Sequence, residues 1–472
     1  MRAALAGIFF LAVDKDLWNE KTIKQGAGKM PTVKKLDHTS HLILHRTSKN
    51  EIREGITVIV RGEGAWVYDQ DGKRYLDLDA GVTRPVHVGH GSKELAQAAY
   101  DQMCRLAYFT PMSFANLPAM ELAEVLAGIA PNGINRFTFE SGGSEAVETA
   151  MKLAKHYHYY RGDKGRFKIM SRRGAYHGVN GIGLRALGTV LPMRQVMEPL
   201  APGAAFIESP YCYRCPHHLT PQNCDLVCAR ELARIIEFEG PEQFSAFIGE
   251  PIQQAYGALK PPVEYWPIIR DICNRYGILL IADEVICGFG RTGKMFATEH
   301  FDLKPDMITM AKGITSGYVP LGAVGCTEKV MEPIEVFNHL HTYGNHPVPC
   351  AVGVKNIEIL RREHLVEKSA AMGDYFLEGL KNLQHYPTVG EVRGTGLWLA
   401  IDFTIDEKNR TPYPTPNLMN LVARAKEKGV ITKTMGLALE FAPPLTIQKD
   451  EIDFALRVIE ECIAEEERAM GL

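Results

Sequence analysis

The chain has 472 residues, is 46% hydrophobic and 23% charged, and carries a formal net charge of −3. This length is too great for one ordinary core, so we expect two or more domains. The charge balance gives no reason to expect nucleic acid or a membrane surface as a partner, and no apolar run reaches the roughly 18 residues that a membrane-spanning helix needs.

The first segment, residues 1–35, begins with MRAALAGIFFLAVDKD. One arginine followed by an apolar run could be the core of a signal peptide, but no clean cleavage site follows it. We favour a disordered arm, or an extension ahead of a true start at Met30. Because the ten cysteines lack a regular disulfide spacing, a reducing, cytoplasmic location fits better than secretion.

Apolar periodicity predicts the elements that follow. Residues 57–79 alternate apolar and polar around Asp71-Gly72, which predicts a β-hairpin with a two-residue turn. Farther along, helices are expected at 145–160, 349–364 and 449–468. Short apolar runs predict strands at 137–139, 167–170, 247–249, 278–283, 307–310 and 322–326. This alternation is typical of an α/β domain with a mainly parallel sheet.

The order of these elements suggests three parts after the N-terminal arm. Residues 36–92 are expected to contribute to a small domain, and residues 93–345 form the large domain. Residues 346–472 complete the small α+β domain.

Ionisable residues follow several of the predicted strands, namely Glu140, Glu250, Asp283 and Lys312. Ligands of an open parallel sheet bind beyond the carboxyl ends of its strands. Asp283 and Lys312 together suit one chemistry: a lysine that forms a Schiff base with pyridoxal 5'-phosphate (PLP), and a carboxylate that keeps the pyridine nitrogen protonated.

A turn that could bind a phosphate lies between the strand at 137–139 and the helix at 145–160. Its sequence is Ser141-Gly142-Gly143-Ser144-Glu145. The two glycines allow the backbone to approach a ligand closely, and the helix start offers free N–H groups. A plain tight turn with Ser144 as the helix N-cap is the alternative.

Other residues could contact a flat cofactor ring or a metal. Tyr176, after the strand at 167–170, could stack on one ring face, and Val285 could cover the other. Residues 288–293 spell G-x-G-x-x-G, but no convincing helix follows, so we reject a dinucleotide site there.

Four cysteines are close in sequence: Cys212, Cys215, Cys224 and Cys228. Two histidines lie between the second and third of them, and this density of ligands predicts a structural zinc site. The spacing is not that of a standard finger. Reduced free thiols in a long loop, or an occasional disulfide, are the alternatives.

Together these motifs resemble the class III aminotransferases, which are fold type I PLP enzymes. The resemblance runs from about residue 55 to the C-terminus and is carried by ILLIADEVICGFGRTG (278–293), MAKGITSGYVPLGAV (310–324), FIGEPIQ (247–253) and FAPPLTI (441–447). These segments are especially similar to the omega-amino acid and amine:pyruvate transaminase branch. The resemblance implies a mainly parallel, seven-stranded type of sheet in a large domain, with a smaller α+β domain.

The resemblance also implies roles for single residues. Lys312 is the Schiff-base lysine and proton shuttle, and Asp283 pairs with the pyridinium nitrogen. Tyr176 stacks on the ring with His177 beside it, and Glu250 lies behind Asp283 and lines the site.

The phosphate site implied by the resemblance involves two subunits. Gly142, Gly143 and Ser144 hold the phosphate, and Thr342 in HTYGNHP reaches the phosphate of the neighbouring subunit. A homodimer with shared active sites is therefore implied.

The sequence departs from the family pattern where substrate carboxylates bind. Many members carry an arginine at the position of Glu440, and in the amine:pyruvate branch a mobile arginine lies near the position of Lys433. A lysine cannot copy a bidentate arginine grip. Arg84 could supply the missing anion contact, or it could be a surface or interface arginine. Two aromatic residues are expected to line the apolar side of the pocket: Tyr108 and Phe109.

We therefore expect an aminotransferase that moves an amino group from an omega-amino acid or amine to a keto acid, with pyruvate as the expected acceptor, by a ping-pong mechanism. An amino-acid racemase, an aminomutase or a 2-oxoglutarate-dependent aminotransferase on the same scaffold would share Lys312 and Asp283. A non-catalytic binding protein would need a broken lysine or phosphate turn, and both are intact.

Overall fold

The structure is a computed structural model that describes residues 41–131, 133–181, 183, 188, 195–200 and 202–472. The chain divides into two units, Met1–Val58 and Ile59–Leu472, which are described separately. The arm predicted at residues 1–35 lies outside the described residues. In the first unit, α1 (Lys49–Glu54) begins with a capping box, in which the side chains of Ser48 and Glu51 accept each other's backbone N–H groups.

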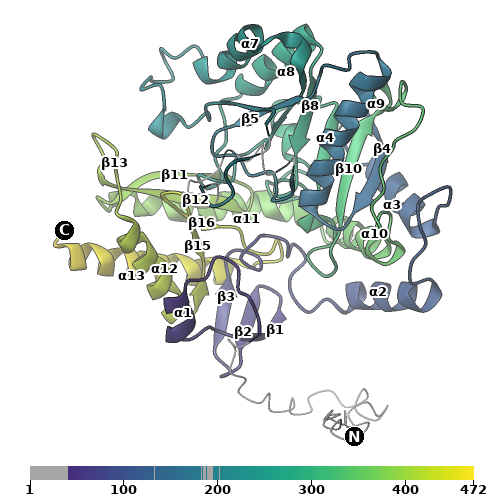
Figure 1. The fold of residues 1–472 in the computed structure, drawn as a ribbon. Coiled ribbons are helices and arrows are strands. Elements are labelled where there is room, and N and C mark those ends of the chain that lie inside the picture. Colours follow the sequence, from purple (N-terminus) through teal and green to yellow (C-terminus); the bar gives the residue numbers. More distant parts are fainter. Residues whose placement is uncertain (1–40, 132, 182, 184–187, 189–194, 201) are drawn as a thin grey trace, which may run out of the picture. The chain divides into compact units, whose positions relative to one another are not determined.

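A seven-stranded sheet forms the centre of the second unit (Figure 1). In spatial order its strands are β4 (Ile134–Glu140), β10 (Gly322–Thr327), β9 (Met307–Met310), β8 (Leu279–Asp283), β7 (Phe244–Gly249), β5 (Lys168–Arg172) and β6 (Ala204–Ile207). The strands from β9 to β6 run parallel, and β10 is antiparallel to both of its neighbours. The predicted α/β class with a mainly parallel sheet is thus confirmed.

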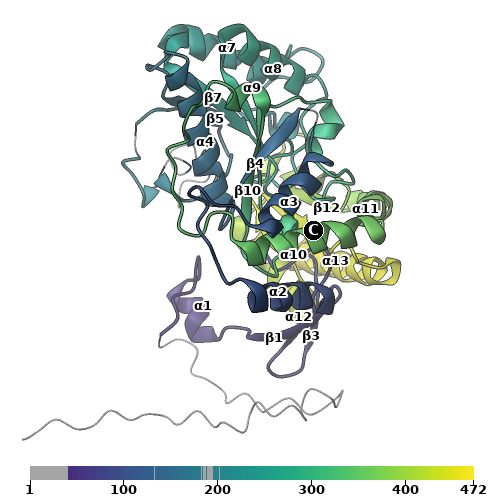
Figure 2. The same cartoon turned by 90° about the vertical axis from the view of Figure 1, so that its right-hand side faces the viewer.

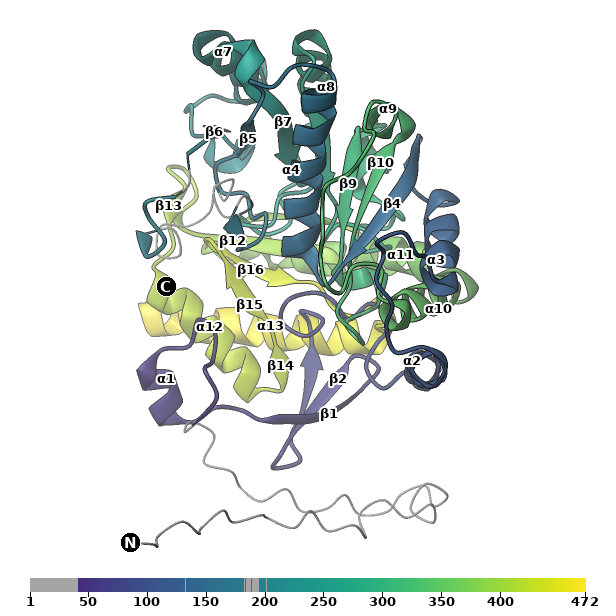
Figure 3. The ribbon, with the colours of Figure 1, turned by 45° about the vertical axis from the view of Figure 1, so that its right-hand side comes forward.

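Both faces of this sheet are buried, which explains why its strands read as continuous apolar runs. Successive residues point to opposite faces, so Phe247 and Leu280 join one core cluster while Ile248 and Ile281 join another. The first cluster includes residues of α7 (Val227–Glu239) and α8 (Tyr265–Tyr276), and the second is completed by α4 (Gly143–Tyr160). Figures 2 and 3 show α4 running along the sheet.

Further helices of this unit lie around the sheet and its connections. They are α2 (Lys93–Arg105), α3 (Leu117–Ala127), α9 (Glu328–Met331) and α10 (Pro347–Arg362), with 3-10 turns η2 (Cys212–Arg214), η3 (Pro241–Gln243), η4 (Ala297–Phe301), η5 (Lys312–Ile314) and η6 (Asn382–His385). The helices predicted at 145–160 and 349–364 correspond to α4 and α10, with starts two residues earlier.

The predicted hairpin at 57–79 is present, but its turn has three residues rather than two. Strands β1 (Ile59–Glu63), β2 (Trp66–Asp69) and β3 (Arg74–Asp77) form one sheet, in which β3 also pairs in parallel with β14 (Val430–Ile431). The Asp69 carboxylate accepts the N–H groups of Asp71 and Lys73 at 3.0 and 2.9 Å. These bonds stabilise the longer turn, Gln70–Gly72, with Gly72 at a φ of 85°.

A third sheet lies in the C-terminal part of the chain. Its strands are β11 (Val389–Thr395), β12 (Trp398–Asp406), β16 (Ala438–Phe441) and β15 (Lys433–Met435), with β13 (Thr411–Pro412) paired to β12. Three helices accompany it: α11 (Leu365–Lys381), α12 (Thr415–Glu427) and α13 (Lys449–Met470). Among the described residues, no helix is both long and apolar enough to cross a membrane.

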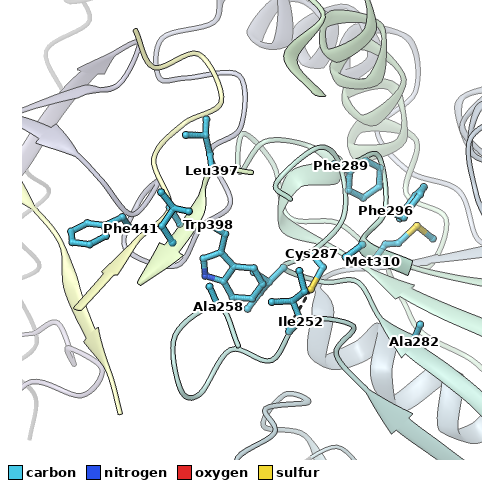
Figure 4. Packing of buried hydrophobic residues seen from close by; sticks show 14 of the residues in the cluster. Ile252, Ala258, Ala282, Cys287, Phe289, Phe296, Met310, Leu397, Trp398 and Phe441 are labelled. Atoms are coloured by element: carbon cyan, nitrogen blue, oxygen red, sulfur yellow. Dashed lines mark hydrogen bonds between the residues drawn. The ribbon is translucent and has the colours of Figure 1, made fainter. Parts of the chain in front are cut away.

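One core cluster joins the third sheet to the loops that follow β7 and β8. Figure 4 shows Trp398 of β12 beside Ala258 and Ile252, with Cys287 close by. The Cys287 thiol donates a hydrogen bond to the Ile252 carbonyl at 3.4 Å. This shared core supports the loops at the carboxyl ends of the parallel strands.

Candidate functional site

A cavity of about 170 Å³ lies where the parallel strands end. Its walls come from the end of β8 and the loops after β5, β7, β8 and β9, and from the start of α4, as expected for this type of sheet. The residues that line it are Gly143, Ser144, Val147, Tyr176, His177, Gly178, Glu250, Asp283, Val285, Ile286, Ala311 and Lys312. Of the ten residues predicted to be catalytic or to bind the cofactor, all but Gly142 and Thr342 line this cavity.

Asp283 ends β8 and is 3% exposed. Its carboxylate accepts three hydrogen bonds: from His177 Nδ1 at 2.7 Å, from Thr309 Oγ1 at 3.0 Å and from the backbone N–H of Val285 at 3.1 Å. Donors that surround a carboxylate fix its direction. Asp283 is thus a rigidly held carboxylate in the wall of the cavity.

Lys312 follows β9 and lies opposite this carboxylate, at a left-handed φ of 49°. Burial and the positive charge of Arg84 lower the pKa of Lys312 to about 7, against the opposing effect of Asp283. A lysine with such a pKa is largely uncharged just above neutral pH and can act as a nucleophile or a base. Non-glycine residues with this strained, left-handed backbone are common at functional sites.

The start of α4 forms an anion site. The helix begins at Gly143, and its N-cap, Gly142, offers no side chain to bond the free N–H groups of the first turn. A Cβ at Gly143 would lie 2.9 Å from Val285 Cγ1, so only glycine fits there. The alternative of Ser144 as the N-cap is wrong, because Gly142 holds that position and the Ser144 hydroxyl accepts the Val179 N–H at 3.3 Å.

The cavity suits PLP. The uncapped start of α4 supplies N–H donors for a phosphate, Lys312 supplies an amine of lowered pKa, and Asp283 supplies a fixed carboxylate for a ring nitrogen. Tyr176 and Val285 line the same cavity, where they are available to the faces of a flat ring.

Glu250 follows β7 and is held by a residue that sequence reasoning missed. Arg172, the fully buried last residue of β5, donates from Nη2 to the Glu250 carbonyl and lies 3.3 Å from Glu250 Oε2. The backbone N–H of Tyr176 donates to Glu250 Oε1 at 3.3 Å. A buried arginine next to this carboxylate compensates its charge and keeps it pointed toward the cavity.

Thr309 was also missed, although it donates directly to Asp283. In the parallel pairing of β8 with β9, Thr309 is the register partner of Asp283. The available signal was a single polar residue in the apolar run MITM (307–310), next to the strand that ends in the carboxylate. Arg172 gave a similar signal at the end of KIMSR (168–172).

The two cations proposed to bind a substrate carboxylate are both paired with protein carboxylates. Arg84 is 3% exposed and donates from Nη1 to Glu440 Oε2. Lys433 Nζ lies 2.6 Å from Asp79 Oδ2, and its side chain is 19% exposed. Neither residue lines the cavity. The interpretation of Arg84 as a surface arginine is wrong, because the Arg84–Glu440 pair is buried.

The Arg84–Glu440 pair yields a stability prediction. Arg84→Met should lower the free energy of unfolding by about 3 kcal/mol, because it leaves the buried Glu440 with only the Trp398 indole N–H and the more distant Lys433. The double variant Arg84→Met/Glu440→Met should regain at least half of that loss. Urea unfolding measures both, and Arg362→Met, which breaks the exposed pair with Glu94, serves as the matched control and should change stability little. Equal effects of Arg84→Met and the control would contradict a stabilising role for the buried pair.

Three further candidates lie outside the cavity in the single chain. Thr342 is exposed, and its carbonyl accepts a hydrogen bond from the Tyr108 hydroxyl. Tyr108 packs edge-on against Tyr343 with ring centres 5.9 Å apart, and Phe109 is 47% exposed. None of the three lines the cavity of its own chain.

The four cysteines do not support the zinc prediction. In the part of the chain that the structure describes, no group of three or more His, Cys, Asp or Glu side chains is arranged to hold a metal, and all four cysteines are free thiols. Their loop is instead anchored by Tyr211 and Arg214, which both contact the buried carboxylate of Asp402. These contacts connect the loop to the third sheet.

The fold and the cavity define a fold type I transferase of the PLP-dependent kind. The chain belongs to the class III aminotransferases: the model of the family "Aminotransferase class-III" matches residues 47–463. Members of this family use PLP.

Several named proteins and solved structures are similar to this chain. It is 39% identical to the uncharacterised aminotransferase YhxA of Bacillus subtilis, over 85% of this chain and 90% of that protein. It is 35% identical to the putrescine–pyruvate aminotransferase of Pseudomonas aeruginosa, over 91% and 95%. An (S)-enantioselective omega-transaminase from Thermomicrobium roseum superposes with a TM-score of 0.86 at 42% identity, covering 90% of this chain and 96% of the other.

Proposed function

We propose that the protein transfers an amino group from an amine or an omega-amino acid to a keto acid, with pyruvate as the acceptor. The observation that carries the proposal is the joint placement of Lys312, Asp283 and the uncapped start of α4 around one cavity. The omega-transaminase similarity of the whole fold and the putrescine–pyruvate relative support the choice of substrates.

The proposed binding roles follow from the positions of the side chains. Gly142, Gly143 and Ser144 would hold the phosphate at the start of α4. Tyr176 and Val285 would contact the two faces of the ring.

Asp283 would pair with the ring nitrogen, and His177 would orient Asp283 through the 2.7 Å hydrogen bond between Nδ1 and Oδ2. Glu250, held by Arg172, would stand beside Asp283 and keep the adjoining wall of the cavity fixed.

When bound, PLP supplies an electron-withdrawing ring that stabilises negative charge on the substrate carbon. Lys312 Nζ would take the proton from that carbon and deliver it to the C4' carbon of the cofactor within the same half-reaction. With the keto acid, Lys312 Nζ would carry a proton in the reverse direction, from C4' to the substrate carbon. The lowered pKa of Lys312, caused mainly by burial, suits this exchange because the amine can both accept and release a proton near neutral pH. Asp283 would hold the ring nitrogen protonated throughout.

For the substrate carboxylate, we propose Lys433 as the contact and assign Arg84 a supporting role. Lys433 is the more exposed of the two, and burial lowers its pKa. Arg84 is engaged with Glu440 and lies near Asp79. Tyr108 and Phe109 would line the apolar side of the pocket once a second subunit is present.

We further propose a homodimer with shared sites. Large apolar side chains are exposed along α2, the following loop and α3: Tyr100, Met103, Phe109, Met112, Phe114, Leu117 and Met120. Leu117 alone is 78% exposed, and a surface of this kind is typical of an interface. Thr342, exposed in the single chain, would reach the phosphate bound by the partner.

In the proposed domain division, residues 36–92 and 346–472 form the small domain and residues 93–345 form the large domain. The pairing of β3 with β14 supports this division.

A cytoplasmic location is proposed because all ten cysteines are free thiols, which a reducing compartment maintains.

A donor panel tests the proposed reaction. Purified protein with PLP is mixed with an aliphatic diamine, an omega-amino acid or an arylalkyl amine, and with pyruvate or 2-oxoglutarate. We expect alanine to form from pyruvate, with parallel lines in double-reciprocal plots, as a ping-pong mechanism requires. Glutamate formation alone would reassign the acceptor to 2-oxoglutarate. Interconversion of amino-acid enantiomers without a keto acid would contradict the proposal and point to a racemase.

A further inference from the structure

A buried carboxylate links the phosphate-binding turn to the segment that carries Thr342. Glu140 is the last residue of β4, directly before Ser141, and is 2% exposed. Its Oε1 accepts from Thr149 Oγ1 at 3.0 Å and lies 3.2 Å from His339 Nε2. Its Oε2 lies 3.1 Å from His341 Nδ1. This carboxylate is therefore bonded to one hydroxyl and one imidazole through Oε1, and a second imidazole lies close to Oε2 without a hydrogen bond in the single chain.

The two histidines belong to a segment, His339–Asn345, that lies along an open edge. β4 is the outer strand of the seven-stranded sheet, so one side of its backbone has no neighbouring strand. Asn345 supplies the missing bonds: its N–H donates to the Phe139 carbonyl at 3.0 Å, and its Oδ1 accepts the Phe139 N–H at 2.9 Å. The segment is thus attached to the end of β4 at both of its own ends.

Thr342 lies between these two attachments. A turn closes where the Gly344 N–H donates to the His341 carbonyl at 2.9 Å, which places Thr342 and Tyr343 at its exposed corners. His341 precedes Thr342 directly and approaches both Glu140 and, at 3.4 Å from its Nε2, the Ser141 hydroxyl. The position of Thr342 therefore depends on contacts made at the base of the phosphate-binding turn.

The burial of Glu140 makes the groups around its carboxylate important for its placement. A carboxylate this deeply buried is unfavourable unless cationic or hydrogen-bonding groups compensate it. Here two of the neighbouring groups, the imidazoles of His339 and His341, lie on the connection between α9 and α10 rather than in the sheet. The charge of Glu140 thus favours one placement of that connection over others.

We propose that Glu140 is a positioning residue for the cofactor site: through His339 and His341 it sets the place of Thr342 and thereby the affinity of the dimer for PLP. This inference rests on the proposed function, in which Thr342 contacts the phosphate held by the neighbouring subunit. In this proposal Glu140 does not contact the cofactor itself. It determines how well Thr342 can contact the phosphate bound by the partner.

A double-mutant cycle on PLP binding tests the inference. Apoprotein is titrated with PLP, and the dissociation constant is read from the visible absorbance of the bound cofactor. Glu140→Gln, which keeps the shape and removes the charge, should raise the dissociation constant by about 10-fold, and Thr342→Ala should raise it by a similar factor. The double variant should be no weaker than the weaker single variant, because Glu140 acts through Thr342.

The controls separate positioning from general damage. Glu328→Gln removes another carboxylate paired to β4, through Arg136 at 2.7 Å, and should leave PLP binding unchanged. If Glu140→Gln folds poorly, His341→Asn takes its place in the double-mutant cycle. Its effect on the dissociation constant for PLP should also be non-additive with that of Thr342→Ala. Sedimentation of each variant checks that the oligomeric state is the same.

Two results would overturn the inference: an unchanged dissociation constant in both Glu140→Gln and His341→Asn, or losses that multiply in the double variants, as independent structural damage would. Failure of the proposed function looks different, since the wild-type protein would then bind no PLP or form no amino acid from any donor in the panel.

Discussion

Replacing Lys312 by alanine should lower the rate of amino-group transfer by about 10⁴-fold or more, because the same amine attaches the cofactor and carries the proton. The rate of alanine formation from pyruvate measures the loss. Lys294→Ala, which changes an exposed lysine in the loop after β8, is the matched control and should be fully active. Activity above about one hundredth of wild type in Lys312→Ala would exclude Lys312 as the proton carrier.

The lowered pKa of Lys312 adds a pH dependence to this prediction. Burial and Arg84 bring the pKa of Lys312 to about 7. Below that pH the amine is protonated and cannot attack the aldehyde of PLP, whereas above it the neutral amine reacts. The rate of reconstitution of apoprotein with PLP should therefore rise through pH 7 and level off, as followed by absorbance between about pH 6 and 9. A rate that still rises steeply at the upper end would mean that the lysine is unperturbed.

Asp283→Asn should be the second most damaging substitution. It preserves the side-chain shape but removes the negative charge that the ring nitrogen needs, and a loss of about 10²–10³-fold in turnover is expected. The contacts from His177 and Thr309 would also meet an amide instead of a carboxylate. Single-turnover conversion of the cofactor with a good amine donor measures the effect on the chemical step itself.

Thr309→Val is the control for this experiment. It removes one hydrogen bond to Asp283 and keeps the charge, so a loss of only about 10-fold or less is expected. If the two variants were equally impaired, the hydrogen-bond network rather than the charge of Asp283 would be the important feature.

The large sheet could be predicted from sequence because its strands are buried on both faces. Runs such as ILLIAD (278–283) and MITM (307–310) carry no polar face, and an ionisable residue ends the first run and follows the second by two positions, so both the strands and the nearby functional residues are visible. β6 (Ala204–Ile207) was not predicted, because its four small and apolar residues give too short a pattern. The hairpin turn was misjudged because the Asp69 side chain, not the Asp-Gly pair, determines its length.

In the candidate site, the residues in local motifs could be predicted from sequence, and the residues that depend on long-range contacts could not. Asp283, Lys312 and the turn at 141–145 were recognisable because each is a local motif. Arg172 and the pairing of Arg84 with Glu440 were not, because these contacts join residues far apart in the chain whose proximity only the tertiary structure determines. The zinc prediction is not supported for a related reason: Cys212, Cys215, Cys224 and Cys228 line one pocket, yet no three ligand side chains of the described residues are arranged to hold a metal.

The parallel pairing of β3 with β14 has a consequence for synthesis on the ribosome. Leu76 pairs with Val430, and the indole N–H of Trp66 donates to Glu451 at 2.6 Å, so β2 and β3 bond to a part of the chain that is synthesised much later. The nascent hairpin therefore keeps the edge of β3 exposed until β14 has been synthesised. Such a long-range closure is slow. A chain that ended before β14 would retain Lys312 but would present an unpaired strand to its neighbours.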